Sequence, residues 1–408
     1  MIKIAIMGYG VVGSGLVELI DENREAKKCN EEIVITSILV RNKEKHKNKN
    51  HSEVLTTDIE EFFSKESDIV VEVMGEITKS LIYVKRALNL KKHVVTANKD
   101  LLAEYGEELF ELANENGVAL KFEASIGGGI PVIKSLIESL EGNNINSIKA
   151  ILNGTTNFIL TKMDKEKLSY EEALKEAQEL GFAEANPEAD VIGYDAARKL
   201  SLLSTLAFRK KVSWKNINIQ GITEVESVDF DYAYKINCKV KLLCISNNSD
   251  DGVYATVKPV LVENESVLAQ INNEVNIVIF NGDAIGEIIL IGKGAGKMPT
   301  GLAVYADVLD IVNKRFTKIT AFKKEEAKII ENLQGECSAV LRIENSKEQD
   351  IIKKCANEFT FIQVLQKQIE GETGVLVKAN SEIEIDRFID GLLANSYVNS
   401  IKKIIKID

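Results

Sequence analysis

The chain has few of the residues and patterns that mark metal centres, disulfide frameworks, membrane spans or nucleic-acid surfaces. Three histidines are too few and too scattered for a His-rich metal site. Five cysteines, odd in number and without C-x-x-C spacing, do not suggest a disulfide framework. No apolar run approaches the ~18 residues of a membrane span. A net charge of −11 opposes binding to nucleic acid and to anionic membranes.

The remaining composition is that of an ordinary globular protein, with 45% hydrophobic and 28% charged residues. Its 408 residues predict two or three domains. The chain begins as a strand rather than a secretion signal, and its scattered cysteines (Cys29, Cys238, Cys244, Cys337 and Cys355) fit a reducing compartment. We therefore expect a cytoplasmic protein.

The first third of the chain alternates between apolar strands and helices, which predicts a parallel sheet covered on both faces. The expected strands are Lys3–Met7, Ile33–Val40, Asp68–Val73, Lys92–Thr96 and Val118–Phe122. The expected helices include Ser14–Ile20, Lys79–Leu90 and Leu101–Asn116. The polar segment 42–52 is expected to be an exposed loop.

A glycine turn with G-x-G-x-x-G spacing, formed by Gly8, Gly10 and Gly13, joins the first strand to the first helix. The first glycine permits a tight turn, the second allows close approach of a pyrophosphate, and the third lets helix pack on strand. The N–H groups at the helix start, those of Val11 and Val12 among them, would receive the phosphates. The alternative is a tight turn without a ligand.

Two basic positions follow later strands. Arg41 stands where NAD-specific folds often carry an acidic residue, with Lys43 and Lys45 beside it. Because an arginine there can pair with a 2′-phosphate, NADP(H) is favoured, with NAD(H) and a solvated loop as alternatives. Lys99 follows the fourth strand at the sheet edge where ligands bind, and so would face a nicotinamide, although a lysine at a helix start is commonly solvated.

The segment Glu123–Pro131 contains three consecutive glycines after the fifth strand. Exposed backbone carbonyls and one carboxylate would suit a hard cation, whereas a flexible interdomain turn is the alternative.

The middle of the chain indicates an α+β domain with an open mixed sheet. Ser169–Glu172 is a capping box opening a helix that stops at Gly181, and a helix is expected over 192–208. Strands are expected at Val253–Val262, Asn276–Phe280 and Glu287–Ile291, and a helix at Thr300–Val312. The polar cluster Asn153–Asn157, including Thr155, forms either a turn or a ring of groups around a polar substrate.

Asp190, Asp195 and Lys199 share one segment, and a helix places Asp195 and Lys199 on one face. The surrounding leucines predict a buried helix, in which a lysine must be paired and its pKa is easily moved. Such a lysine can donate the proton that carbonyl reduction needs, and a neighbouring carboxylate can bind a substrate ammonium. The alternative is a surface ion pair.

The last ~85 residues have the order βαββαβ, the ferredoxin-like arrangement. The expected elements are strand Ala339–Ile343, helix Lys347–Glu358, strands Phe361–Gln368 and Val375–Ala379, helix Glu382–Asn395 and strand Val398–Ile407. A charged segment, 322–331, is expected to be a linker. The predicted domains are 1–130, of Rossmann type and completed by about 300–318, 131–318, and 323–408.

Together these motifs resemble the homoserine dehydrogenase family over about residues 1–315. The resemblance rests on the glycine turn, Glu72–Gly75, Thr96–Lys99, Glu123–Pro131, Asn153–Asn157, Asp190–Leu200 and Gly292–Thr300. It implies NAD(P)H-dependent interconversion of L-aspartate 4-semialdehyde and L-homoserine, on the route to threonine, isoleucine and methionine. It also implies a homodimer paired through the middle domain. Glu76 departs from the family, which often has a glycine there.

The resemblance further implies roles for individual residues. Lys199 would be the proton donor and Lys99 the second active-site lysine, while Glu184 and Asp195 would bind the substrate. Glu123, with the carbonyls of Ile126, Gly128 and Ile130, would hold a sodium ion. Gly181 and Gly296 would touch the cofactor from the second domain.

The C-terminal unit resembles an ACT domain, a module that often binds an amino-acid effector. Its first strand is followed by Glu344–Lys347 rather than an Asp-x-Pro-Gly-like turn, which weakens the case for threonine feedback. Two other hypotheses remain: a Rossmann dehydrogenase for another amino-acid carbonyl, and a cofactor-binding sensor without turnover.

Overall fold

The computed structural model describes residues 1–25, 31–316, 326–332, 334–366 and 368–407. Two compact units divide the chain. The first comprises Met1–Asn146, Arg198–Lys215 and Asn276–Ala327, and the second comprises Ser147–Ala197, Asn216–Val275 and Lys328–Asp408. Cys29, residue 367 near the end of the expected strand Phe361–Gln368, and residues 322–325 of the expected linker lie outside the described residues.

The first unit contains a six-stranded parallel sheet in the order β3-β2-β1-β4-β5-β6, which confirms the predicted doubly wound Rossmann-type sheet. Its strands are β1 (Ile2–Met7), β2 (Ile33–Leu39), β3 (Leu55–Thr56), β4 (Ile69–Glu72), β5 (His93–Thr96) and β6 (Leu120–Lys121). All four residues of β4 are buried, as expected for a strand covered on both faces.

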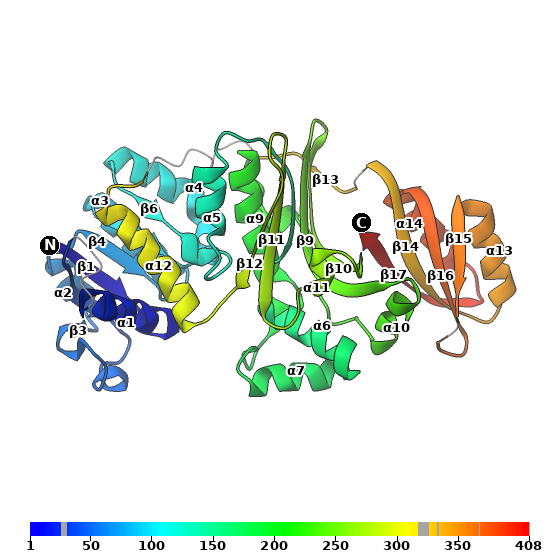
Figure 1. The fold of residues 1–408 in the computed structure, drawn as a ribbon, viewed down its shortest axis with the longest axis horizontal. Helices are drawn as coiled ribbons and strands as arrows, with labels where there is room; N and C mark the ends of the chain where they lie inside the picture. Colours follow the sequence, from blue (N-terminus) through cyan, green and yellow to red (C-terminus); the bar gives the residue numbers. More distant parts are fainter. Residues whose placement is uncertain (26–30, 317–325, 333, 367, 408) are drawn as a thin grey trace. The chain divides into compact units, whose positions relative to one another are not determined.

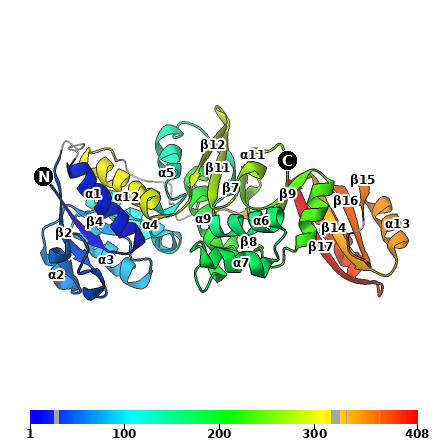
Figure 2. The ribbon, with the colours of Figure 1, turned by 60° about the horizontal axis from the view of Figure 1, so that its bottom comes forward.

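Helices α1 and α12 lie side by side on the sheet (Figures 1 and 2). They can approach closely because Gly15 has no side chain. A Cβ at this position would lie 2.2 Å from the Lys297 carbonyl oxygen. Val304 and Val308 of α12 pack in the same apolar core as β1 and β4. The helical segments of this unit are α1 (Val11–Glu25), η1 (Glu44–His46), η2 (Ser52–Val54), α2 (Ile59–Ser64), α3 (Thr78–Asn89), α4 (Lys99–Asn116), η3 (Glu123–Ser125), α5 (Val132–Lys134), η4 (Ser135–Ser139) and α12 (Lys297–Val312).

A few elements carry residues of both units. Helix α9 (Tyr194–Phe208) begins in the second unit and continues in the first, and β7 (Ile145–Ile151) and β11 (Val275–Gly282) also straddle the division. In the first unit β11 neighbours β12 (Gly286–Lys293).

The second unit is built on a mixed sheet whose strands follow the order β7-β9-β10-β17-β14-β16-β15. The pairs β7–β9 and β9–β10 are antiparallel, whereas β10 and β17 are parallel. The remaining strands are β8 (Asn218–Ile219), β9 (Cys238–Ser249), β10 (Gly252–Glu263), β13 (Ile329–Ile330), β14 (Gln334–Asn345), β15 (Phe361–Leu365), β16 (Glu372–Ser381) and β17 (Val398–Ile407). The helical segments are α6 (Gly154–Glu166), α7 (Tyr170–Glu179), α8 (Glu188–Val191), η5 (Trp214–Asn216), α10 (Ser227–Lys235), α11 (Val267–Gln270), α13 (Glu348–Glu358) and α14 (Glu382–Leu393).

The C-terminal part has the predicted order β14-α13-β15-β16-α14-β17. Its sheet is antiparallel, with β14 between β16 and β17. Strand β17 also pairs with β10, so this part shares one sheet with the middle of the chain. The segment expected to be a linker contains β13, which pairs with β10 at Val253 and Tyr254, and that part of the expectation is wrong.

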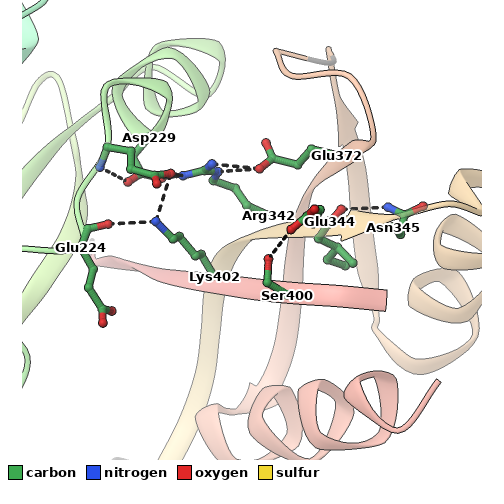
Figure 3. Close-up of polar contacts among 10 residues, drawn as sticks. Glu224, Asp229, Arg342, Glu344, Asn345, Glu372, Ser400 and Lys402 are labelled. Atoms are coloured by element: carbon green, nitrogen blue, oxygen red, sulfur yellow. Dashed lines mark hydrogen bonds and ion pairs between the residues drawn. The ribbon is translucent and has the colours of Figure 1, made fainter. Parts of the chain in front are cut away.

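A buried arginine ties β14 to α10 (Figure 3). Arg342 is 5% exposed and donates through Nη1 to Asp229 and Glu226, and through Nη2 to Glu372 at 2.9 Å. Lys402 of β17 adds an ion pair with Glu226 at 3.0 Å. A buried charge requires such partners because its transfer from water is costly.

Local sequence accounts for several helix ends. The Ser169–Glu172 capping box forms both hydrogen bonds, and α7 gives way to Gly181 in the left-handed conformation, as predicted. Helix α4 is capped by Asn98 and followed by Gly117, also left-handed. Helix α1 begins at Val11, three residues earlier than expected.

Candidate active site

The glycine turn after β1 leaves open space over one residue. A Cβ on Gly8 would lie 2.6 Å from the Val73 carbonyl oxygen, and one on Gly13 would lie 2.2 Å from the Gly8 carbonyl oxygen. A Cβ on Gly10 would meet nothing within 4 Å, and Val11 is 65% exposed. Since the first N–H groups of a helix lack acceptors within it, those near Val11 and Val12 fit a phosphate.

A cavity of about 830 Å³ lies beside this turn. Gly8, Tyr9 and Gly10 line it together with Arg41 and Lys45, two of the three basic residues singled out in the sequence. Its volume is in the range of small-molecule and cofactor sites, and it opens where the sheet order changes direction, between β1 and β4. The residues here therefore fit a dinucleotide.

The polar segment after Arg41 is largely exposed, as expected, but it also contacts the glycine turn. The Tyr9 hydroxyl donates to the Asn50 carbonyl at 2.8 Å, and the rings of Tyr9 and His46 stack with centroids 5.5 Å apart. The Lys49 ammonium donates to the Tyr9 carbonyl at 3.0 Å and lies 4.5 Å from the Tyr9 ring centroid. This segment thus forms part of the wall around the turn, which its polar composition did not indicate.

Lys99 is the first residue of α4, directly after the turn that follows β5. Its ammonium lies 3.5 Å from the Asp100 carboxylate, whose other oxygen lies 3.4 Å from the Arg198 guanidinium. Arg198 precedes Lys199 on α9, so one carboxylate links the start of α4 to the part of α9 that bears Lys199.

In the second unit, Asn153 holds two of the expected carboxylates together. Its amide nitrogen donates to Asp190 at 2.7 Å and to Asp195 at 2.9 Å. Its amide oxygen accepts from the Thr156 N–H at 2.8 Å and so caps α6. The cluster Asn153–Asn157 therefore forms the start of α6 and also supplies the side chain that binds both carboxylates. The Thr155 hydroxyl donates to the Phe182 carbonyl at 2.6 Å.

Helix α9 places Asp195 and Lys199 one turn apart, as predicted. The leucines of this helix are buried, and Asp195 is only 9% exposed. Lys199 itself is half-buried, so it is less buried than the apolar residues of its helix. The reason is positional: Leu200 and Leu203 occupy the core-facing side of α9, and Lys199 lies beside it.

The two cofactor glycines expected from the second domain fall in different units. Gly181 is exposed and left-handed in the second unit, near the exposed Glu184. Gly296 belongs to the first unit, where it is the N-cap residue of α12, and the carbonyl of the next residue, Lys297, lies close to Gly15 of α1. Its expected origin in the second domain is therefore wrong, because α12 packs on α1.

Glu123 is a buried carboxylate at the start of the glycine-rich segment. It accepts from the N–H groups of Ile133 at 3.0 Å and Lys134 at 2.7 Å. Burial raises its pKa to about 7. Gly127 and Gly128 are both left-handed, and Gly128 packs against the Gly294 backbone.

This arrangement fits a cation held by Glu123 with the carbonyls of Ile126, Gly128 and Ile130, because a nearby positive charge would offset the cost of ionising a buried carboxylate. Over the described ranges, no group of three or more His, Cys, Asp or Glu side chains is placed to hold a metal ion. A site here would therefore rely on backbone carbonyls.

A doubly wound sheet whose glycine turn lies beside a cavity at the switch point is typical of the dinucleotide-binding domains of dehydrogenases. Comparison with known families makes the assignment specific. A model described as "Homoserine dehydrogenase, NAD binding domain" matches residues 8–123, and one described as "Homoserine dehydrogenase" matches residues 131–309. The chain belongs to the homoserine dehydrogenase family and is an NAD(P)-dependent oxidoreductase.

Individual relatives support this assignment, two of them over the whole length of the chain. A homoserine dehydrogenase of Bacillus subtilis is 35% identical, with 100% of this chain and 98% of the relative covered. The crystal structure of one from Thiobacillus denitrificans has a TM-score of 0.90 at 32% identity, covering 100% and 98%. A hyperthermophilic archaeal homoserine dehydrogenase solved with NADPH has a TM-score of 0.66 at 28% identity, covering 78% of this chain and 99% of that one.

Two features of the site escaped the sequence analysis. Asn153 was noted only as part of a polar cluster, although an Asn three residues before Thr156 at a helix start is a recognisable N-cap. Glu72 was noted only as part of a motif, although an acidic residue ending an apolar strand predicts a buried, hydrogen-bonded carboxylate.

Proposed function

We propose that this enzyme interconverts L-aspartate 4-semialdehyde and L-homoserine with NADP(H) in preference to NAD(H), and that Lys199 exchanges the proton with the substrate oxygen. The observation that carries the proposal is the joint hydrogen bonding of Asp190 and Asp195 by Asn153, with Lys199 one turn beyond Asp195 on α9. Asp190 comes from α8, whereas Asp195 and Lys199 share α9, so the arrangement supports an anionic pair next to a proton donor.

The carboxylates account for recognition of an amino-acid substrate. The substrate's ammonium is attracted by Asp190, Asp195 and the exposed Glu184, and hydrogen bonds from Asn153 orient the first two. Asp195 also accepts a hydrogen bond from the substrate hydroxyl, and Thr155 contributes to substrate binding.

Two lysines act at the oxygen of the carbonyl group that is reduced. Lys199 donates a proton to it as the aldehyde is reduced, and accepts one when homoserine is oxidised. Lys99, held beside Asp100, supplies a second positive charge near the nicotinamide. When bound, the reduced nicotinamide supplies the hydride.

The basic rim of the cavity supports NADP(H). Arg41 and Lys45 line it after the end of β2, and Arg41 stands where NAD-specific folds often carry an acidic residue. An arginine there pairs well with a 2′-phosphate. We also propose a sodium ion beside Glu123, Ile126, Gly128 and Ile130 that stabilises this segment.

The test is homoserine oxidation at alkaline pH, followed by nicotinamide absorbance with NADP and NAD separately. Higher kcat/KM with NADP, reduced selectively by Arg41→Gln, supports the cofactor assignment. Preference for NAD would support the assigned reaction and refute the pairing of Arg41 with a 2′-phosphate. Absence of turnover from folded protein that binds cofactor would refute the substrate assignment.

The turn after β14, in the ACT-like C-terminal part, lies where related modules often bind an amino-acid effector. This turn is closed by Asn345, which donates to the Thr373 hydroxyl at 2.9 Å and accepts from the Lys347 N–H at 3.0 Å. Glu344 is likewise engaged, by Asn399 and Ser400 (Figure 3). We propose that this ACT-like part binds an amino-acid effector, threonine being the first to test, and a flat activity curve to millimolar threonine would refute threonine feedback.

We further propose a cytoplasmic homodimer. None of the described cysteines, Cys238, Cys244, Cys337 and Cys355, forms a disulfide, which suits a reducing compartment. No helix within the described ranges is long and apolar enough to span a membrane. Light scattering of the purified enzyme tests the dimer, and cell fractionation tests the location.

A further inference from the structure

Glu72 is a fully buried carboxylate that has none of the catalytic or binding roles proposed above. It ends β4 at the carboxyl edge of the sheet and is 0% exposed. Burying a carboxylate costs free energy unless hydrogen bonds compensate for the lost water. Its partners therefore indicate what the carboxylate holds in place.

The two oxygens of Glu72 face different elements. Oε1 accepts from the Met74 N–H at 2.9 Å and from the Ser80 hydroxyl at 2.8 Å. Oε2 accepts from the Thr96 hydroxyl at 2.6 Å. One side chain thus joins the turn after β4, the first turns of α3 and the end of β5.

From Thr96 the hydrogen bonding continues to the start of α4. The Thr96 hydroxyl oxygen accepts from the Asn98 N–H at 3.0 Å. The Asn98 side chain caps α4 by accepting from the Leu101 N–H at 3.0 Å, and donates to the Glu76 carbonyl at 2.8 Å. Lys99 is the next residue, so its backbone is fixed by bonds that lead back to Glu72.

Burial raises the pKa of Glu72, and the hydrogen bonds from Thr96, Met74 and Ser80 oppose that shift. These donors favour the ionised form, because a carboxylate accepts at both oxygens. A neutral amide in its place would present an NH₂ group to at least one donor.

We infer that Glu72 is a positioning residue, which acts through Thr96 and Asn98 to set the first turn of α4 and so the Lys99 ammonium. The inference rests on the proposed function, which places Lys99 near the nicotinamide. Small displacements of a group at the reacting centre cost up to ~10²-fold in rate, so a hydrogen-bonded brace beneath Lys99 has a kinetic consequence.

Two matched variants separate positioning from stability. Thr96→Val and Ser80→Ala each remove one buried hydroxyl that donates to Glu72, but only Thr96 lies on the path to Lys99. We expect Thr96→Val to lower kcat about tenfold or more, and Ser80→Ala to change it less than twofold. Thr96→Ser, which keeps the hydroxyl, should restore kcat to within twofold. NADPH affinity should change less than threefold in all three.

Glu72→Gln repeats the test if Thr96→Val does not fold, and the same loss of kcat is expected. In a Lys99→Ala background, Thr96→Val should lower kcat by less than a further twofold, because the two changes act through one group.

Equal losses of Tm with unchanged kcat in Thr96→Val and Ser80→Ala would overturn the inference and leave the proposed function intact. If Lys99→Ala itself leaves kcat unchanged, the role proposed for Lys99 fails, and the positioning role fails with it.

Discussion

Gly10→Ala is the most direct test of how the glycine turn binds a dinucleotide. In the structure the added methyl group meets no atom within 4 Å. Gly10 is also absent from the glycines with positive φ, so alanine fits its backbone. The variant should fold as well as the parent protein, and loss of unfolded-state entropy would stabilise it by ~0.4–1 kcal/mol.

Cofactor binding should suffer because the methyl group fills the space through which a pyrophosphate approaches the α1 N-terminus. Losing one charge-assisted hydrogen bond costs ~1.5–3 kcal/mol. Since ~1.4 kcal/mol is a factor of ten, NADPH should bind about 10- to 100-fold more weakly.

The assay is fluorescence titration with NADPH alongside thermal unfolding. Gly142→Ala is the matched control, because Gly142 is exposed and also has open space for a Cβ, and neither measurement should change. Gly13→Ala should instead lose stability by ~1–3 kcal/mol, because its methyl group would overlap the Gly8 carbonyl. If Gly10→Ala binds NADPH within twofold of the parent, the phosphate does not pass over Gly10 and the argument is wrong.

Three other predictions concern chemistry, stability and ions. Lys199→Ala should lower kcat by ~10²–10⁴-fold with near-normal NADPH binding, and a loss under threefold in steady-state assays would contradict its role as proton donor. Arg342→Met should lower the free energy of unfolding in urea by ~3–5 kcal/mol, because it leaves the buried carboxylates of Asp229 and Glu372 without their cation. Lys402→Met removes a partly exposed ion pair and should lower it by less than ~1 kcal/mol. Equal losses in the two variants would contradict the role of the buried network. Glu123 has its pKa raised from 4.5 to about 7, so its folded form holds a proton more tightly and its contribution to stability falls as pH rises across that interval. If sodium binds beside it, NaCl should raise Tm more than choline chloride at pH 8, and less so at pH 6; equal effects of the two salts at pH 8 would refute the site.

The dinucleotide-binding half was predictable because its signals are local. Gly8, Gly10 and Gly13 need only neighbouring residues to specify the turn, and apolar runs such as that ending at Glu72 specify buried parallel strands. The capping box at Ser169 has the same character. The helix spacing that pairs Asp195 with Lys199 is likewise local, so that pair was predicted.

What the sequence did not predict depends on distant partners. Strand β9 was missed because Lys239 and Lys241 interrupt its apolar pattern, yet Lys241 is buried and donates to Asn157 and to the carbonyl of Ile271. Helix α10 was missed because its acidic residues look solvated, whereas Asp229 is buried against Arg342 more than 100 positions away. The apolar pattern indicated that the helix bearing Lys199 is buried. It could not show that Lys199 is only half-buried, because burial of a helix does not specify the exposure of each side chain.

The parallel pairing of β17 with β10 has a consequence for shortening the chain. Val260, Leu261 and Val262 are at most 1% exposed, and their edge is covered by Ile405, Lys406 and Ile407. A chain trimmed of its ferredoxin-like part would bare this strand, with unpaired peptide groups and valine-rich flanks. Such an edge is a template for aggregation, so a stable shortened enzyme would need charged residues or a proline introduced along that side of β10.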